Sequence, residues 1–408
     1  MEEWKTYKIG SLCSISSSKR IFAKEYQSSG IPFYRGKEVI EKQKGETVST
    51  ELYISKSRYD EIKNKFGVPE EGDMLLTSVG TLGIPYVVKN ETFYFKDGNL
   101  TWFSNFKGIN SKFLYYWFLS PMAKNAIDAK AIGSTQKALT IDALSKFEID
   151  IPNIETQEKI VSILSSLDSK IELNRRINDN LEQQAQALFK SWFVDNPNPN
   201  WSETTLSEIA NFIGGYSYKG EELTDSSNIA MVTIKNFGRN GGFKADGFKG
   251  ITPSAKLKEC HYANLFDILV AHTDLTQNAD VIGNAELLLT YDRYDSIIFS
   301  MDLVKVLPKN NFPYRFLLAA MLKNKIFKGH CLGYVNGTTV LHLSKKALPE
   351  FEVRIPSKVE AKTMNDTLAP YYKRMAEVLQ ENDRLMQLRD TLLPKLMSGE
   401  LRISEIEK

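Results

Sequence analysis

The last quarter of this chain repeats an earlier stretch without a gap, since residues 133–192 superimpose on residues 337–396 at a constant offset of 204 positions. The matched positions include Gly133 with Gly337, Leu144 with Leu348, Phe147 with Phe351, and Ile151-Pro152 with Ile355-Pro356. An internal repeat of this length constrains the fold, because two copies of one pattern are expected to build two copies of one structural unit.

Part of the repeat has the alternating four-and-three spacing of apolar residues that is typical of a coiled coil. The predicted seam consists of Ile160, Leu164, Leu167, Ile171, Asn178, Leu181 and Leu188 in the first copy, and Met364, Leu368, Tyr371, Met375, Asn382, Leu385 and Leu392 in the second. A seam asparagine costs stability but fixes the register, because slippage leaves its amide unpaired. Antiparallel pairing of the two helices, which we expect, brings Asn178 and Asn382 together, as parallel pairing of in-phase repeats also would. Pro370 is expected to kink the second helix or to mark a looser first turn.

Weaker echoes extend the repeat upstream. Residues 4–9 resemble residues 201–206, and residues 72–76 resemble residues 266–270. We therefore predict an α+β protein with a pseudo-twofold internal repeat, in which two similar domains are joined and spaced by two long antiparallel coiled-coil helices. The expected segments are a first domain at 1–153, a first spacer helix and linker at 154–196, a second domain at 197–356, a second spacer helix at 357–397, and a C-terminal tail at 398–408.

Composition limits the class of protein. The three cysteines are odd in number and scattered, which argues against a disulfide framework and indicates a reducing compartment. No apolar run approaches the length of a membrane span, and the start of the chain is acidic, unlike a signal peptide. The expected location is the cytoplasm. The formal net charge of +2 says little about partners, so any basic surface must come from local clustering.

No catalytic signature is present, and we expect neither catalytic nor metal-binding residues. The chain lacks an Asn/Asp-Pro-Pro-Tyr-like methyltransferase loop, a Pro-Cys nucleophile and a Walker-type lysine loop. The pairs Cys260-His261 and His330-Cys331 lack the ligand spacing of a metal site. Residues 350–354 alternate polar and apolar side chains, which favours a strand over a nuclease carboxylate cluster.

Polar, basic and aromatic residues gather instead at glycine-marked turns in both domains. Such side chains donate to phosphates and read base edges. The candidate DNA-binding residues of the first domain are Lys19, Arg20, Tyr34, Arg35, Lys37, Thr77, Ser78, Thr81, Lys130, Ser134, Gln136 and Lys137. Those of the second are Tyr216, Tyr218, Lys219, Lys235, Asn236, Arg239, Asn240, His272, Thr273, Gln277, Asn278, Asn336, Thr338 and Thr339. Each cluster alone is more typical of a solvated loop, but the recurrence of the clusters in both repeats favours a binding face for the set.

Several stretches in order resemble one known family, the specificity subunit of type I restriction–modification enzymes. The resemblance covers nearly the whole chain. It is carried by residues 143–152, 155–160 and 164–171, by the tail at residues 392–401, and less specifically by residues 72–76 and 267–270. One departure is that the second copy has Ala361 where the first has Gln157.

The resemblance implies a subunit that is not an enzyme by itself. Two target-recognition domains each read one half of a bipartite sequence in double-stranded DNA, and the paired helices span the gap between the halves. It further implies that two methyltransferase subunits dock on the helices, and that restriction subunits add translocation and cleavage. No cofactor is expected in this chain, whereas S-adenosylmethionine, ATP and magnesium are expected on the partner subunits. The rival hypotheses are a protein–protein adaptor with two binding domains and a diverged nuclease.

Overall fold

The computed structural model describes residues 4–45, 48, 50–131, 133, 137–239 and 241–406. Internal contacts divide the chain into two compact units. The first unit contains residues 1–172 and 385–408, and the second contains residues 173–384. Both boundaries fall inside the long helices, so each of these helices belongs partly to each unit. Within the described residues, no helix is long and apolar enough to cross a membrane.

The strands of the first unit are β1 (Lys5–Lys8), β2 (Ser14–Ser16), β3 (Ile31–Tyr34), β4 (Tyr53–Ile54), β5 (Met74–Thr77), β6 (Pro85–Val87), β7 (Tyr94–Phe95), β8 (Leu100–Ser104) and β9 (Glu148–Ile151). An antiparallel sheet has the order β2-β8-β5-β6, a smaller sheet has the order β4-β3-β7 with β3 and β7 parallel, and β1 pairs with β9. Alternation along β5 separates two cores. Met74 and Leu76 enter the core that the helices cover, and Leu75 enters the core of the smaller sheet.

The short helices of the first unit are α1 (Ile9–Leu12), η1 (Ala23–Glu25), α2 (Gly36–Gln43), α3 (Lys56–Phe66), α4 (Ser111–Leu119), α5 (Pro121–Lys130), α6 (Ile141–Ser145) and α12 (Ile403–Ile406). Side chains of Ser55, Asn110, Ser120 and Thr140 accept hydrogen bonds from the first turns of α3, α4, α5 and α6. These caps explain where each helix begins, because the first amides of a helix lack intrahelical partners.

The strands of the second unit are β10 (Ser202–Thr205), β11 (Ala210–Gly214), β12 (Ile229–Val232), β13 (Lys249–Gly250), β14 (Tyr262–Ala263), β15 (Ile268–Ala271), β16 (Thr273–Asp274), β17 (Ala285–Leu287), β18 (Ser296–Phe299), β19 (Leu303–Pro308), β20 (Val335–Asn336), β21 (Leu341–Leu343) and β22 (Glu352–Ile355). Its sheets have the orders β11-β19-β15-β17, β13-β12-β18-β14 and β16-β21-β20, and β10 pairs with β22. In the second of these sheets, β12 and β18 are parallel.

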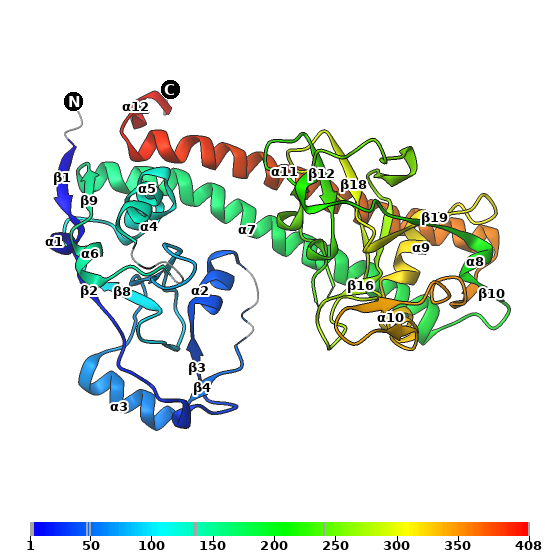
Figure 1. The fold of residues 1–408 in the computed structure, drawn as a ribbon, viewed down its shortest axis with the longest axis horizontal. Coiled ribbons are helices and arrows are strands. Elements are labelled where there is room, and N and C mark those ends of the chain that lie inside the picture. The colour runs from blue at the N-terminus through cyan, green and yellow to red at the C-terminus, as the bar shows by residue number, and fades with distance from the viewer. Residues whose placement is uncertain are drawn as a thin grey trace. The chain divides into compact units, whose positions relative to one another are not determined.

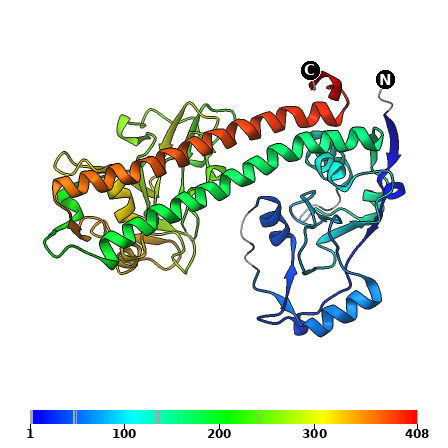
Figure 2. The same ribbon diagram turned by 180° about the vertical axis from the view of Figure 1, so that it is seen from behind.

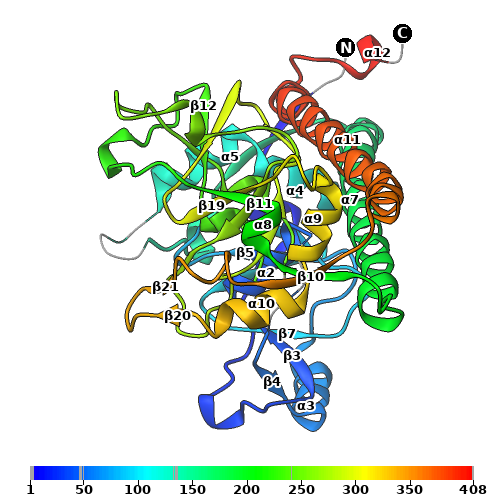
Figure 3. The same cartoon turned by 90° about the vertical axis from the view of Figure 1, so that its right-hand side faces the viewer.

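The short helices of the second unit are α8 (Leu206–Ile209), η3 (Gly220–Glu222), η4 (Ile234–Asn236), η5 (Ala245–Gly247), η6 (Glu259–His261), α9 (Arg315–Leu322) and α10 (Lys325–Leu332). The hairpin of β20 and β21 follows α10 directly and extends beside it (Figure 3). Between β12 and β15 lie the 3₁₀ helices η4, η5 and η6 and the short strands β13 and β14, where the first unit has the α-helices α2 and α3 between β3 and β5.

The two units share one topology, which confirms the predicted internal repeat. Their four-stranded antiparallel sheets have the same order when β2, β8, β5 and β6 are matched to β11, β19, β15 and β17. Long-range backbone bonds also recur, since Leu139 N donates to Ser78 O at 2.9 Å and Leu343 N donates to His272 O at 2.8 Å.

The long helices are α7 (Ile154–Lys190), which continues into the π-helical turn η2 (Ser191–Asp195), and α11 (Lys358–Met397). They run antiparallel, as predicted (Figures 1 and 2). In the first unit Arg389 Nη1 lies 3.0 Å from Asp168 Oδ1. In the second unit Asn174 Nδ2 donates to Asn382 Oδ1 at 2.9 Å.

The expected pairing of Asn178 with Asn382 is wrong. Asn174 is the partner of Asn382, and Asn178 Nδ2 donates to the Met375 backbone oxygen at 3.3 Å. The register depends on which side-chain layers meet, and this cannot be deduced from positions within each helix. Pro370 does not end α11, which is helical on both sides of it.

All predicted seam side chains lie at least partly inside the units. Ile160, Leu164, Ile171, Leu368, Met375 and Asn382 are buried, and Leu167, Asn178, Leu181, Leu188, Met364, Tyr371, Leu385 and Leu392 are half-buried. Neighbouring residues such as Tyr372 and Leu396 are also buried, because each helix packs on the core of a unit as well as on the other helix.

The two copies of the repeat differ at Gln157 and Ala361, and both of these residues are buried. Gln157 is fully buried, where it accepts from Asn110 N at 2.9 Å and donates to the oxygens of Gly108 and Pro152. In the second unit Asn365 of α11 performs a similar role, because its Oδ1 accepts from Phe316 N at 3.0 Å. Both positions are buried, so this difference lies inside the units and not on an exposed helix face.

Candidate nucleic-acid interface

Three segments of the first unit that contain predicted DNA-binding residues lie against one another. Thr77 Cγ2 lies 3.8 Å from the position that a Cβ on Gly36, at the start of α2, would occupy. The loop after β5 pairs with the segment before α6, because Val79 forms a bridge with Ala138 and Gly80 N donates to Lys137 O at 3.2 Å. The start of α2, the β5–β6 loop and the segment around Lys137 therefore form one contiguous surface.

A cavity of about 480 Å³ opens on this surface. Arg35, Lys37 and Thr81 line it together with Asn99, which the sequence did not point to. Arg35 also pairs with the buried Glu38 at 2.7 Å. Burial works against the charge on Glu38, but hydrogen bonds from the Arg35 side chain and backbone hold its pKa below the usual value. The pair fixes the Arg35 side chain, while Lys37 remains more exposed.

Three predicted contacts of the first domain face inward, which corrects their assignment as DNA contacts. Tyr34 is buried and stacks on Phe93 at 4.6 Å between ring centroids. Thr77 Oγ1 accepts from Ile84 N at 2.9 Å, and the buried Ser78 hydroxyl lies 2.6 Å from Thr101 Oγ1. These groups support the loops, and their hydrogen-bonding capacity is used inside the unit.

Three further predicted residues of the first domain, Lys19, Arg20 and Lys130, are exposed but do not line the cavity beside α2. Lys19 Nζ lies over the Phe66 ring at 4.3 Å, and Arg20 pairs with Asp97 at 2.7 Å. Lys130 is exposed at the end of α5. Ser134 and Gln136 lie outside the described residues.

Predicted residues of the second domain also converge from separate segments. Gln277 Nε2 donates to the Thr338 backbone oxygen at 2.8 Å, which joins the loop after β16 to the loop between β20 and β21. Arg239 Nε lies 3.6 Å from Asp280 Oδ2, which adds the loop before β13. The exposed predicted residues on these loops are Arg239, Gln277, Asn278, Asn336, Thr338 and Thr339.

A buried carboxylate shapes the middle loop of this group. Asp274 accepts from the backbone amides of Thr276, Val281 and Ile282. Burial opposes the charge of Asp274, but these hydrogen bonds lower its pKa below the usual value. Because both ends of the loop are bonded to one carboxylate, Gln277 and Asn278 are presented from a fixed backbone.

Three predicted contacts of the second domain are buried, which again corrects their assignment. Tyr216 donates to Glu222 at 2.7 Å, and Thr273 donates to Asp302 at 2.9 Å. Asn236 accepts from Thr233 N and donates to Lys244 O. All three side chains are structural, because their polar groups are already paired in the interior.

The remaining predicted residues of the second domain occupy mixed positions. Lys235 and Lys219 are exposed, and Tyr218 is half-buried with a pKa that burial raises. His272 is half-buried, and burial together with His342 and Lys345 lowers its pKa, so the neutral imidazole is favoured at pH 7. Asn240 lies outside the described residues.

His342 was missed at the sequence level. It lies on β21 opposite both Thr273 and Asn336, and its side chain is exposed between the buried Leu341 and Leu343. The alternation Leu-His-Leu was the available signal, because a strand with one buried face presents its middle residue to solvent.

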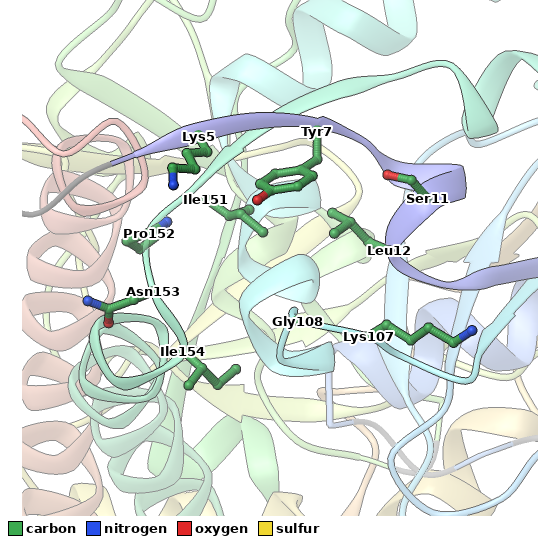
Figure 4. Close-up of a pocket in the computed structure, with 10 residues that line it drawn as sticks. All are labelled: Lys5, Tyr7, Ser11, Leu12, Lys107, Gly108, Ile151, Pro152, Asn153 and Ile154. Atoms are coloured by element: carbon green, nitrogen blue, oxygen red, sulfur yellow. The ribbon is translucent and has the colours of Figure 1, made fainter.

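A larger cavity in the first unit, of about 680 Å³, has a different lining (Figure 4). Tyr7, Leu12, Ile151 and Ile154 contribute apolar surface, and Lys5 and Lys107 contribute charge. Its lining contains no histidine, cysteine or carboxylate.

The cysteine–histidine pairs also carry no visible chemistry. Burial raises the pKa of the Cys331 thiol to about 12, which leaves it protonated and unreactive. Among the described residues, no three histidine, cysteine, aspartate or glutamate side chains gather in a way that could hold a metal ion.

Comparisons with known proteins agree with this geometry. The family described as "Type I restriction modification DNA specificity domain" matches residues 1–183 and 198–385. The MjaIX type I restriction enzyme specificity subunit of Methanocaldococcus jannaschii is 26% identical over 99% of this chain and 95% of its own length. The HindI specificity subunit of Haemophilus influenzae is 27% identical over 67% of this chain and 73% of its own length.

A solved structure supports the fold. The crystal structure of a type I restriction–modification S subunit from M. genitalium matches with a TM-score of 0.54 at 20% identity, and the match covers 97% of this chain and 96% of that one. The family match includes most of both units, and each unit has the repeated α+β topology. The chain therefore belongs to the family of type I restriction–modification DNA specificity subunits, the non-catalytic, DNA-recognising components of these systems.

Proposed function

We propose that each unit reads one half of a bipartite DNA sequence with the loops that follow β5 and β15. The observation that carries this proposal is that, in each unit, polar loops from separate parts of the chain lie together at the same place in the shared fold. The backbone bond from Leu139 to Ser78 recurs from Leu343 to His272, and exposed polar loops lie beside it in both units. One framework with different side chains fits two modules that read different bases by one method.

In this proposal the side chains divide the work by chemistry. Lys37, Lys137 and Lys235 carry exposed ammonium groups suited to phosphates. Arg239, Gln277 and Asn278 suit base edges, because Arg pairs with guanine and Asn or Gln pairs with adenine in the major groove. Arg35 is partly committed to Glu38, which favours a fixed, oriented contact over a mobile phosphate contact.

We further propose that α7 and α11 set the gap between the half-sites and provide the surface on which methyltransferase subunits dock. Restriction subunits then join the complex in the cytoplasm. S-adenosylmethionine, ATP and magnesium belong to those partner subunits in this proposal. This division of labour is supported by the family of the chain.

The first test separates DNA recognition from a protein–protein adaptor. Fluorescence titration of the chain, assembled with its modification subunits, against duplex DNA should show affinity that falls about 10³-fold between about 50 and 200 mM salt, as expected for six or more phosphate contacts. Affinity that does not change with salt would support an adaptor. The same preparation, incubated with DNA and magnesium without restriction subunits, should leave the DNA intact, whereas cleavage would indicate a nuclease.

The second test addresses the two half-sites. Residues 1–153 are replaced by the corresponding segment of a relative, and the methylated sequence is determined by methylome sequencing of cells that carry the hybrid. One half of the recognised sequence should change and the other should stay the same. A change in both halves would contradict independent reading.

A further inference from the structure

A buried charged network in the second unit holds a loop that contains a proposed DNA contact. Glu286 on β17 is 2% exposed, and its Oε1 accepts from the backbone amide of Gly242 at 2.6 Å. Its other oxygen pairs with Lys323 at the end of α9, and Lys323 also pairs with Glu182 of α7 at 3.0 Å. A buried carboxylate therefore fixes one side of the loop that contains Arg239.

A second polar side chain holds the other side of the same loop. Asn284 precedes Glu286 by two positions, and its Nδ2 donates to the backbone oxygen of Gly238 at 2.8 Å. Its Oδ1 accepts from Lys328 Nζ at 2.8 Å. Gly238 also donates to Gly242 O at 2.9 Å, so the two held glycines are bonded to each other.

One lysine serves two carboxylates in this network, and burial raises the pKa of Glu286 above its usual value although Lys323 opposes this. Burial works against the charge on Lys323, but Glu182 and Glu286 raise its pKa above the usual value, so it remains an ammonium ion. A buried ion pair contributes little net stability compared with apolar residues of the same size, which leaves specificity of conformation as the reason to keep it. Both Gly241 and Gly242 adopt positive φ angles, so this backbone needs a defined hold.

The first unit uses the equivalent strand position for a similar purpose. Tyr86 pairs with Leu75 of β5 as Glu286 pairs with Leu269 of β15. The Tyr86 hydroxyl donates to Glu91, which also pairs with Lys42 of α2 at 2.5 Å. Helix α2 begins with the segment that contains Arg35 and Lys37. Tyr86 is the middle residue of β6, and Glu286 is the middle residue of β17. Glu286 bonds directly to the loop that contains Arg239, and Tyr86 bonds through Glu91 to the helix α2, which begins beside Arg35 and Lys37.

We infer that Glu286 and Asn284, held by Lys323 and Lys328, are positioning residues that fix the backbone at Gly238 and Gly242 and thereby orient Arg239 toward DNA. This inference rests on the proposed function for the identity of the ligand. The hold on the loop itself is a property of the unit and can be measured without DNA.

The experiment compares two double variants in the complex assembled with the modification subunits. E286M/K323M removes the acceptor for the Gly242 amide together with both charges of the Glu286–Lys323 pair, and it leaves Glu182 without its cation, as E286Q/K323M also does. E286Q/K323M removes the charges but keeps an oxygen that can accept from Gly242. Methylation rates are measured on DNA with the correct sequence and with single-base changes in either half-site.

E286M/K323M should lose about tenfold of the discrimination at the second half-site, since one misread base pair typically costs that much or more. E286Q/K323M should stay within about twofold of the unmodified chain, and discrimination at the first half-site should not change in either variant. Arg239→Ala should produce a loss at the same base pair, and adding E286M/K323M to it should cause little further loss. Full discrimination in a folded E286M/K323M complex, or losses that add to those of Arg239→Ala, would overturn the inference.

Two further measurements keep the test decisive. If E286M/K323M does not fold, Asn284→Ala removes the hold on Gly238 and should reduce discrimination at the second half-site, whereas an unchanged value contradicts the inference. Hydrogen exchange of peptides covering residues 236–248 should be faster in E286M/K323M than in E286Q/K323M without DNA. Equal exchange overturns the positioning role. Absence of half-site discrimination in the unmodified complex instead counts against the proposed function.

Discussion

The two units carry different chemistry at matching positions of one framework. In the first, Trp102 lies opposite Leu75 and its indole donates to Asp73 at 2.8 Å. In the second, Lys305 lies opposite Leu269 and pairs with Asp267 at 3.7 Å. The acid recurs at the start of the central strand, but its partner is neutral in one copy and charged in the other. A shared backbone therefore does not imply shared electrostatics.

The turn before that strand shows the same contrast in backbone strain. Gly72 has a φ of 91°, and the matching residue of the second unit, Phe266, has a φ of 69°. Glycine adopts this region freely, whereas phenylalanine does so at a cost. Phe266 packs edge-on against Phe316 at 5.4 Å between ring centroids, which offsets that cost. The second unit thus relies more on side-chain contacts where the first relies on glycine.

The largest difference should appear when the lysine of each buried network is neutralised. Lys323→Met leaves Glu286 and Glu182 without their cation inside the second unit, and should destabilise that unit by about 3–5 kcal/mol. Lys42→Met should cost less than about 1 kcal/mol, because Lys42 and Glu91 are partly exposed and Glu91 keeps the Tyr86 hydroxyl. Urea unfolding combined with hydrogen exchange of each unit measures both values.

Equal costs for the two lysine variants would contradict the contrast between the networks. Lys37→Met provides the control, because Lys37 is exposed and its ion pair with Glu41 is long at 3.7 Å. Its effect on unfolding should be close to zero.

The internal repeat could be predicted from the sequence, but the direction of several polar side chains could not. The repeat is recognisable in the sequence because matching positions of the two copies are buried in the two cores and so remain apolar, as at Phe147 and Phe351. The inward direction of Ser78, Thr77 and Asn236 was not visible. A polar residue in a glycine-marked turn can face solvent or satisfy a buried backbone group, and only the three-dimensional path of the chain decides between them.

A smaller effect is expected from neutralising the matched acids. Asp267→Asn replaces the carboxylate beside Lys305 and Arg315 with a weaker amide partner, which leaves Lys305 with the Tyr262 backbone oxygen and the Phe299 ring, and should cost roughly 2–3 kcal/mol. Asp73→Asn should change stability by less than about 1 kcal/mol, because the amide oxygen can still accept from Trp102. Similar costs at the two positions, measured by urea unfolding at pH 7, would contradict the distinction between a neutral and a charged partner.

The first of these acids also predicts a pH dependence. Burial raises the pKa of Asp73 above the usual value of 3.8, despite hydrogen bonds that lower it. The folded unit therefore holds this proton more tightly than the unfolded chain does. The resulting stabilisation is present below the unfolded-state pKa and is lost as pH rises through the folded-state pKa. Subtracting the unfolding curve of Asp73→Asn from that of the unmodified chain should isolate this contribution, and a difference that grows in the opposite direction would contradict it.

Substitutions at the matched turn should have effects near or below 1 kcal/mol. Gly72→Ala should destabilise the first unit by about 1 kcal/mol through backbone strain alone, because nothing lies within 4 Å of the added Cβ. Phe266→Gly relieves strain but loses the contact with Phe316, so its net effect should be smaller than that of a typical Phe truncation in a core. Calorimetric melting of both variants measures the contrast, and a large loss for Phe266→Gly would show that the ring contact outweighs the strain.

The smallest effect is expected from moving the chain ends between the two junctions that follow the long helices. In the first unit, the Trp4 indole lies within 2.9 Å of the Cβ position of Gly399, just beyond α11, and Ile403 belongs to the same core that Trp4 packs against. In the second unit, Trp201 packs on Phe193 at 4.7 Å, just beyond α7. At both junctions a tryptophan packs against the segment just beyond a long helix. A permutant opened between Pro197 and Asn198, with the native ends joined by linkers of several lengths, should therefore fold with an unfolding free energy within about 1 kcal/mol of the original and keep its DNA affinity.

The cut is placed before Asn198 because the side chains of Asn198 and Trp201 both donate to Glu360, so these two residues must stay on the same side of the cut. If every linker length gives an unfolded chain, the junctions are not equivalent, and the continuous connection at residues 196–200 does more than join two repeats.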